Sequence, residues 1–135
     1  MAHRGITVKS PENTISSYKE AIEAGFNALE LDILQTKDEE LICSHNFDLE
    51  RESDGVGWAQ DIEYKNLKTI QAGVYTHPQN TQPIPSLENV LDKIPKHIFL
   101  NIEIKTHSVF DLSASKTFAT LFKKGKIKHS FMVSS

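Results

Sequence analysis

The sequence has little of what marks several classes of protein. Its 135 residues include one cysteine, so no internal disulfide can form and a reducing compartment is expected. No apolar run approaches the roughly 18 residues of a membrane-spanning helix, and no leader peptide is visible. The net charge of −3 and the pI near 6.0 offer no basic field for nucleic acid. A composition of 39% hydrophobic and 24% charged residues predicts one globular, cytoplasmic domain over residues 1–135.

Helical and strand patterns alternate along the chain. A helix is expected to open at Ser10 or Asn13, which can cap it, and to end at Gly25, which can adopt the left-handed conformation. His3 marks the stub of a first strand. Such alternation specifies a parallel sheet with helical crossovers. Further strands are predicted over 27–34, 40–44, 98–105 and 130–134, and further helices over 87–94 and 111–124.

Two segments break the alternation. The turn-prone residues 36–39 separate the strands 27–34 and 40–44, which predicts a local hairpin or a strand extension. Residues 46–84 are polar, contain Gly and Pro, and show one modest helical patch at 62–70. We expect a long loop with a functional role there.

Glu30 and Asp32 lie two residues apart in the predicted strand 27–34, so both carboxylates face the same side of it. Strands of a helix-covered parallel sheet are normally apolar on both faces, and an unpaired buried carboxylate is costly. A hard divalent cation such as Mg²⁺ or Ca²⁺ would relieve that cost, because it prefers oxygen ligands. A wet, acidic face on an edge strand is the alternative.

Polar and apolar residues also alternate in the predicted strand 98–105. Asn101, Glu103 and Lys105 share one face, so Glu103 is a candidate third carboxylate. Lys105 lies nearer the carboxyl end of the strand, where ligands collect in parallel sheets, and is a candidate contact for a phosphate. The alternative is a surface Glu–Lys pair, which is worth little energy.

Histidines stand at two probable strand ends, in His3-Arg4-Gly5 and in Ser44-His45. An imidazole exchanges protons near neutral pH, and phosphodiester cleavage needs one group to activate a nucleophile and another to protonate the leaving group. Arg4 offers a forked cation that matches phosphate, and Gly5 lets the backbone turn close to a ligand. Structural roles are expected for the other histidines, which are His77, His97, His107 and His129.

Several motifs occur together in a fixed order. They are His3-Arg4-Gly5, Pro11-Glu12-Asn13-Thr14, Glu30-Leu31-Asp32 followed by Thr36-Lys37-Asp38, Ser44-His45, Ile84-Pro85-Ser86-Leu87 and Glu103-Ile104-Lys105. In order and spacing they resemble the glycerophosphodiester phosphodiesterase family. The resemblance implies an α/β fold, a partial TIM (β/α)8 barrel with about the first four strand–helix units, because a closed barrel takes about 250 residues. The segment 46–84 would correspond to the family's insertion, which helps to recognise the alcohol or glycerol part of the substrate.

The resemblance also implies a function. The chain would hydrolyse a small-molecule glycerophosphodiester to glycerol 3-phosphate and an alcohol, with one divalent cation, Mg²⁺ or Ca²⁺, as cofactor. The implied roles are acid–base catalysis for His3 and His45, phosphate binding for Arg4 and Lys105, and metal binding for Glu30, Asp32 and Glu103.

The chain departs from the family pattern at two places. Asn46 follows His45 where the family usually has Asp, and Glu52-Ser53 follow Arg51 where it has a Thr-rich run. Two other functions remain open. One is a catalytically inactive half barrel that binds phosphodiesters or a partner protein, and the other is a phosphoinositide-type phospholipase C.

The two ends of the sequence suggest the N-terminal portion of a larger domain. Almost no room for a strand precedes His3, and the chain stops on residues 131–135, which resemble a strand just completed. A half barrel leaves two sheet edges unpaired, which predicts association, for example with a second copy in a homo-oligomer.

Overall fold

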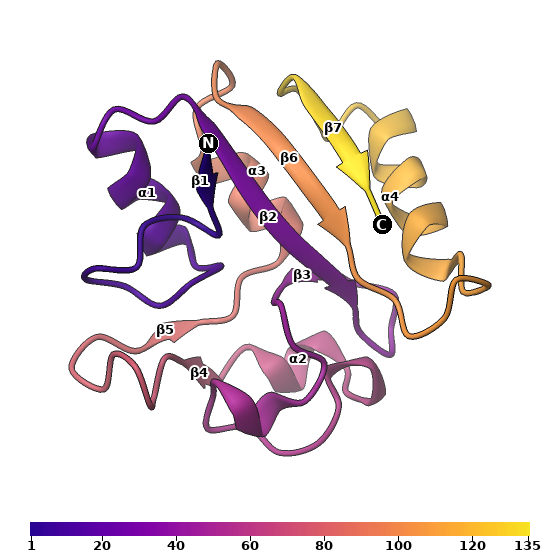
Figure 1. Cartoon of the computed structure of the whole chain (residues 1–135). Coiled ribbons are helices and arrows are strands. Elements are labelled where there is room, and N and C mark those ends of the chain that lie inside the picture. The colour runs from indigo at the N-terminus through magenta and orange to yellow at the C-terminus, as the bar shows by residue number, and fades with distance from the viewer.

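A mostly parallel sheet forms the centre of the molecule (Figure 1), in a computed structural model that describes all residues 1–135. Its parallel strands, in spatial order, are β1 (Ala2–His3), β2 (Ala28–Gln35), β6 (Phe99–Ile104) and β7 (Phe131–Ser134). The short strand β3 (Leu41–Cys43) pairs antiparallel with the end of β2. The predicted parallel sheet is confirmed, and so is the hairpin.

Three helices cover one face of this sheet. They are α1 (Ile15–Glu23), α3 (Leu87–Lys93) and α4 (Ser113–Lys123). Nineteen buried residues form the main core, and it joins these helices to the apolar side of the strands. Leu29, Leu31 and Ile102 belong to that side, while the alternating polar residues of β2 and β6 face the other way. The polar face is therefore the one that can carry a site. None of the helices combines the length and the apolar character needed to cross a bilayer.

The start of α1 differs from the prediction. Thr14, rather than Ser10 or Asn13, caps this helix, and its side chain accepts a hydrogen bond from the Ser17 amide. Asn13 has φ 55 and directs its side chain to Asp32 instead, so it cannot cap. The predicted ending is confirmed, because Gly25 follows the helix with φ 99.

Residues 46–84 form a small folded unit rather than one long loop. A second cluster of six buried residues holds it against β2 and β3, and includes Leu34, Leu49 and Leu67. Its pieces are too short to be recognised by periodicity, although the predicted patch at 62–70 does contain a helix. The elements are η1 (Leu49–Arg51), η2 (Ala59–Asp61), α2 (Tyr64–Leu67), β4 (Gln71–Ala72) and β5 (Gln82–Pro83).

Candidate active site

Three carboxylates converge on the polar face of the sheet. Glu30 and Asp32 come from β2 and Glu103 from β6, and Asp32 and Glu103 are direct neighbours in the parallel register. One oxygen from each of the three lies within 4.8 Å of the others. The predicted cluster of carboxylates is therefore present in the structure. Glu30 and Glu103 are partly exposed, whereas Asp32 is buried.

The buried carboxylate of Asp32 has unequal partners on its two oxygens. Oδ2 lies 2.8 Å from Arg4 Nε and accepts a hydrogen bond of 3.1 Å from Asn13 Nδ2. Oδ1 has no hydrogen-bond partner, and the nearest cation to it is Lys105 Nζ at 3.9 Å. The side-chain oxygen of Asn101, on the neighbouring strand, is also buried without a partner. Buried oxygens normally find a partner, so these two are candidates for ligation of a cation.

His3 is the last residue of the short strand β1, and Arg4 follows it directly. The Arg4 side chain lies between Glu12 Oε2, at 2.7 Å, and Asp32 Oδ2. Burial opposes its charge, but the hydrogen bond to Glu12 and the nearby carboxylates raise the pKa of Arg4 above its usual value. His3 Nε2 lies 3.0 Å from Glu30 Oε1, and the His3 side chain is 61% exposed. Both predicted residues therefore contact the carboxylate cluster.

Lys105 lies on the other side of the cluster. Its Nζ donates a 2.8 Å hydrogen bond to Glu103 Oε1. This bond holds the pKa of Glu103 below its usual value, against a small opposing effect of burial. Because the same ammonium also lies near Asp32, the Glu103–Lys105 contact belongs to the site rather than being an isolated surface pair.

His45 follows the end of a strand, as predicted, and reaches the site through the predicted hairpin. The strand β3 runs antiparallel to β2, so the chain after Cys43 turns back toward the middle of β2. There the Ser44 amide donates to the Asp32 carbonyl at 3.0 Å. His45 Nδ1 lies 3.3 Å from Asn46 Oδ1. His45 lines a small cavity together with Glu12, which holds Arg4, and Asn13, which holds Asp32.

The sequence patterns predicted no role in the site for Glu12 or Asn13, although both lie in the motif before α1. Glu12 holds Arg4, and Asn13 Oδ1 accepts hydrogen bonds from the Tyr18 hydroxyl at 2.8 Å and the Asp32 amide at 3.2 Å. Arg4 and Asn13 have φ values of 60 and 55, a backbone conformation that residues other than glycine rarely adopt. Strained backbone of this kind is concentrated at functional sites, which supports a functional site around Asp32.

Gly5 has a packing role in the structure. A Cβ at this position would lie 2.5 Å from Ser17 Oγ and 2.7 Å from the Ser17 carbonyl carbon. Gly5, with φ 88, therefore permits close packing of the first turn on α1, and the predicted approach of its backbone to a ligand stays a prediction. The structural roles predicted for two histidines are supported, because His77 and His129 contact the carbonyls of Thr7 and Ile94.

The charges of the site suit a divalent cation. The three carboxylates of the cluster outnumber its two permanent cations, Arg4 and Lys105, by one charge. The oxygens are hard ligands of the kind that Mg²⁺ and Ca²⁺ prefer, and one of them lacks a partner. The Glu12 carboxylate, which holds Arg4, adds one more negative charge, so a bound divalent cation would neutralise the excess. The residues therefore fit such an ion.

Two cavities are lined by residues that contact the cluster. One of about 280 Å³ is lined by His3, Arg4 and Glu12 together with residues of the segment 46–84. Another of about 400 Å³ is lined by Lys105, by Phe47 and by His107, whose ring lies 3.8 Å from that of Phe47.

Comparisons with known proteins agree on one family. The model of the glycerophosphoryl diester phosphodiesterase family matches residues 3–124. A glycerophosphodiester phosphodiesterase of Bacillus subtilis is 35% identical over 96% of this chain and 48% of its own length. One from Caldanaerobacter subterraneus subsp. tengcongensis is 31% identical over 100% of this chain and 56% of its own.

The solved structures extend this similarity to the fold. A phosphodiesterase of Oleispira antarctica, solved in complex with the product sn-glycerol-3-phosphate, matches with a TM-score of 0.83 and 27% identity over 91% of this chain and 51% of that one. A structure from Agrobacterium tumefaciens matches with a TM-score of 0.81 over 99% of this chain. The chain has the partial TIM-barrel fold of these proteins and spans about half the length of the relatives it matches.

Proposed function

Because the chain belongs to the glycerophosphoryl diester phosphodiesterase family, we propose that it hydrolyses glycerophosphodiesters to glycerol 3-phosphate and an alcohol. The observation that carries this proposal is the convergence of three carboxylates with Arg4 and Lys105 on one face of the sheet. Support for the product comes from the Oleispira antarctica relative, which was solved with sn-glycerol-3-phosphate.

Glu30, Asp32 and Glu103 would hold one divalent cation, Mg²⁺ or Ca²⁺. When bound, it would neutralise charge on the phosphate and help to orient the attacking hydroxyl. Arg4 and Lys105 would bind the phosphate oxygens from the two sides of the cluster. Arg4 suits this role because Glu12 and Asp32 fix its guanidinium before a ligand arrives, which lowers the entropic cost of binding.

His3 and His45 would form the acid–base pair. One imidazole would take the proton of the attacking hydroxyl, and the other would give a proton to the oxygen of the leaving alcohol as the P–O bond breaks. His3 is held by Glu30 and His45 by Asn46. If His45 Nδ1 donates to Asn46 Oδ1, its Nε2 is left free to exchange a proton.

The proposal is tested by the release of glycerol 3-phosphate from glycerophosphocholine, with and without added Mg²⁺ or Ca²⁺. His45→Ala should lower kcat by about 10²- to 10⁴-fold, the range for loss of an acid–base group. His97→Ala is the matched control, because His97 is exposed and precedes the start of β6, whereas Glu103 lies near the other end of that strand. Equal rates for the two variants, or turnover that a chelator leaves unchanged, would remove the proposal.

The same assay separates the two alternatives. An inactive half barrel would bind the cation and the phosphodiester without forming product. A phospholipase C of the phosphoinositide type would leave a lasting cyclic phosphate, which ³¹P NMR of the products detects. Hydrolysis directly to glycerol 3-phosphate supports the family activity over both.

A further inference from the structure

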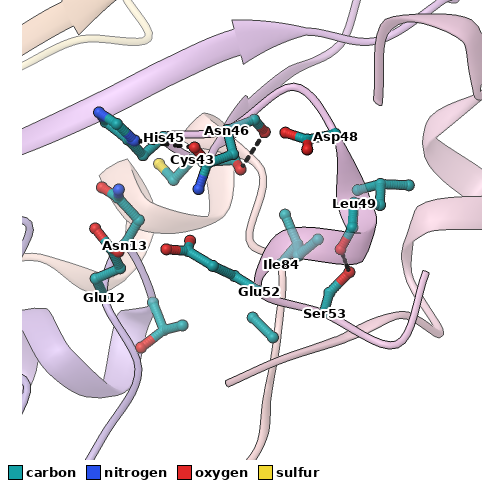
Figure 2. Close-up of a pocket in the computed structure, with 13 residues that line it drawn as sticks. Glu12, Asn13, Cys43, His45, Asn46, Asp48, Leu49, Glu52, Ser53 and Ile84 are labelled. Carbon is teal, nitrogen blue, oxygen red and sulfur yellow. Dashed lines mark hydrogen bonds between the residues drawn. The ribbon is translucent and has the colours of Figure 1, made fainter. Parts of the chain in front are cut away.

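Glu52 extends from the end of η1 toward the residues that support Arg4 and His45 (Figure 2). It lines a cavity with room for about one water molecule, ≈ 30 Å³, between the loop before α1 and the segment that follows β3. Glu12 and Asn46 line the same cavity, and the carboxyl group of Glu52 points toward them (Figure 2). No role was assigned to Glu52 above, and it belongs to the segment 46–84.

Two carboxyl groups in hydrogen-bonding contact must share a proton. Burial, together with the hydrogen bond to Glu12 and the charge of Glu12, raises the pKa of Glu52 to about 7. Burial also opposes ionisation of Glu12, but its hydrogen bonds from Glu52 and Arg4 outweigh that effect and lower the pKa of Glu12. The proton therefore resides on Glu52, which donates to the Glu12 carboxylate.

Both partners of Glu52 are themselves supports of proposed catalytic groups. Glu12 Oε2 accepts from Arg4 Nη1 at 2.7 Å, and Arg4 lies 2.8 Å from Asp32. Asn46 Oδ1 lies 3.3 Å from His45 Nδ1. One side chain thus contacts the group behind the phosphate-binding cation and the group behind a proton-transferring imidazole.

We propose that Glu52 is a positioning residue that fixes Arg4 and His45 relative to each other and ties the segment 46–84 to the catalytic face. The inference rests on the proposed function for its catalytic consequence. The alignment of Arg4 by Glu52, through Glu12, should also affect the binding of a simple anion that is not hydrolysed. Removing a residue that holds a ligand-binding side chain in place typically lowers activity or metal affinity by about 10- to 100-fold.

The pH response follows from the groups that face Glu52. Below about pH 7 the pair carries one proton and Glu12 remains free to hold Arg4. As pH rises through that value, Glu52 ionises, and two adjacent carboxylates repel each other. The other titratable groups around the cavity are Arg4 on the far side of Glu12, His45 and Asp48 on the segment after β3, and the Cys43 thiol, whose pKa of about 12 keeps it neutral.

The experiment compares Glu52→Ala and Glu52→Gln with Glu50→Ala and Glu50→Gln. Glu50 lies two residues away, carries the same charge and is exposed, so it is the matched control. With glycerophosphocholine and Mg²⁺, Glu52→Ala should lower kcat/KM by about 10- to 100-fold at pH 6.5, and Glu52→Gln should restore most of the loss because its amide still donates to Glu12. The ratio of wild-type to Glu52→Gln activity should fall as pH rises from 6 to 8.5, since the glutamine cannot ionise.

A binding measurement keeps this inference separate from the proposed function. If the wild-type chain shows no turnover, the proposed function fails, and calorimetric binding of inorganic phosphate then decides the role of Glu52. Weakening of about 10-fold in Glu52→Ala, with Glu52→Gln and the Glu50 variants unchanged, supports the inference. Should the Glu52 variants match the Glu50 variants in kinetics, pH profile or, without turnover, phosphate affinity, Glu52 has no positioning role. Glu52→Gln is nearly isosteric, so it still provides this comparison if Glu52→Ala fails to fold.

Discussion

The carboxylate of Asp32 is buried, and one of its two oxygens has no hydrogen-bond partner. Its side chain is fully buried, and removing a charge from water costs several kcal/mol unless partners compensate. Arg4 and Asn13 compensate at one oxygen, whereas the other oxygen has no hydrogen bond. A bound ligand can supply the partner that this oxygen lacks. The cation that we propose for the cluster would be that partner.

Melting temperature tests this reading independently of activity. At a concentration of Mg²⁺ or Ca²⁺ 100 times its Kd, binding to the folded state alone adds about 2.7 kcal/mol of stability. For a chain of this size, this corresponds to a rise in Tm of roughly 10 °C, which EDTA should reverse. Asp32→Asn should abolish the rise because it removes the central ligand.

Asp92→Asn is the control for the same measurement, because Asp92 lies exposed on α3. It should keep the full response to the cation. A similar rise in Tm in Asp32→Asn and in the wild type would mean that the cation binds elsewhere on the molecule.

At the scale of elements, α1 depends on a reciprocal cap. The Thr14 side chain accepts from the Ser17 amide, and the Ser17 side chain in turn accepts from the Thr14 amide at 3.2 Å. The same Ser17 hydroxyl lies within hydrogen-bond distance of two carbonyl oxygens, that of Thr14 at 2.8 Å and that of Arg4 at 3.2 Å. The cap therefore connects the start of the helix to the turn that carries a proposed phosphate ligand.

Thr14→Ala should lower the free energy of unfolding by about 1 kcal/mol, the usual cost of losing such a cap. Thr14→Ser keeps the hydroxyl and should lose only a few tenths of that amount. Urea denaturation of the two variants and the wild type measures the difference. Equal losses in both variants would assign the effect to the Thr14 methyl group and not to the hydrogen bond.

Helices and strands with a clear periodicity of apolar residues could be predicted from the sequence. Contacts between residues distant in the sequence were harder to predict. The predicted strand 98–105 is observed as Phe99–Ile104 and the helix 87–94 as Leu87–Lys93, because alternation and capping are local signals. The convergence of Glu30, Asp32 and Glu103 followed from the same alternation. The cap of α1 was wrong because the side chain of Asn13 is engaged by Asp32, a contact 19 residues away in the sequence.

The contributions of His45 and Glu52 show the limit of local patterns. The end of the strand 40–44 was predicted for His45, but the pattern could not show that the hairpin turns this end back onto the middle of β2, beside Asp32. Glu52 lies in a segment whose helices have three or four residues, too few for a period to emerge. Its contact with Glu12 joins segments 40 residues apart, and no spacing rule predicts such a pair.

At the scale of the whole molecule, the sheet has two open edges. The strand β1 pairs only with β2, and β7 pairs only with β6 (Figure 1). Beside the β7 edge, Phe122, Met132 and Val133 are 53%, 51% and 39% exposed. An open strand edge with apolar side chains is a template for pairing with another chain. The chain also spans about half the length of the relatives it matches, and their additional length is one source of cover for this edge.

We therefore expect the 135-residue chain on its own to self-associate through β7. Light scattering during size-exclusion chromatography at increasing protein concentration should show a mass above the 15.2 kDa of one chain. Met132→Lys places a charge on this strand and should shift the population toward the monomer, since charged residues on an edge strand oppose pairing. Val8→Lys is the control, because Val8 is 79% exposed but lies in the loop after β1. Equal effects of the two substitutions would show that association does not depend on the β7 edge.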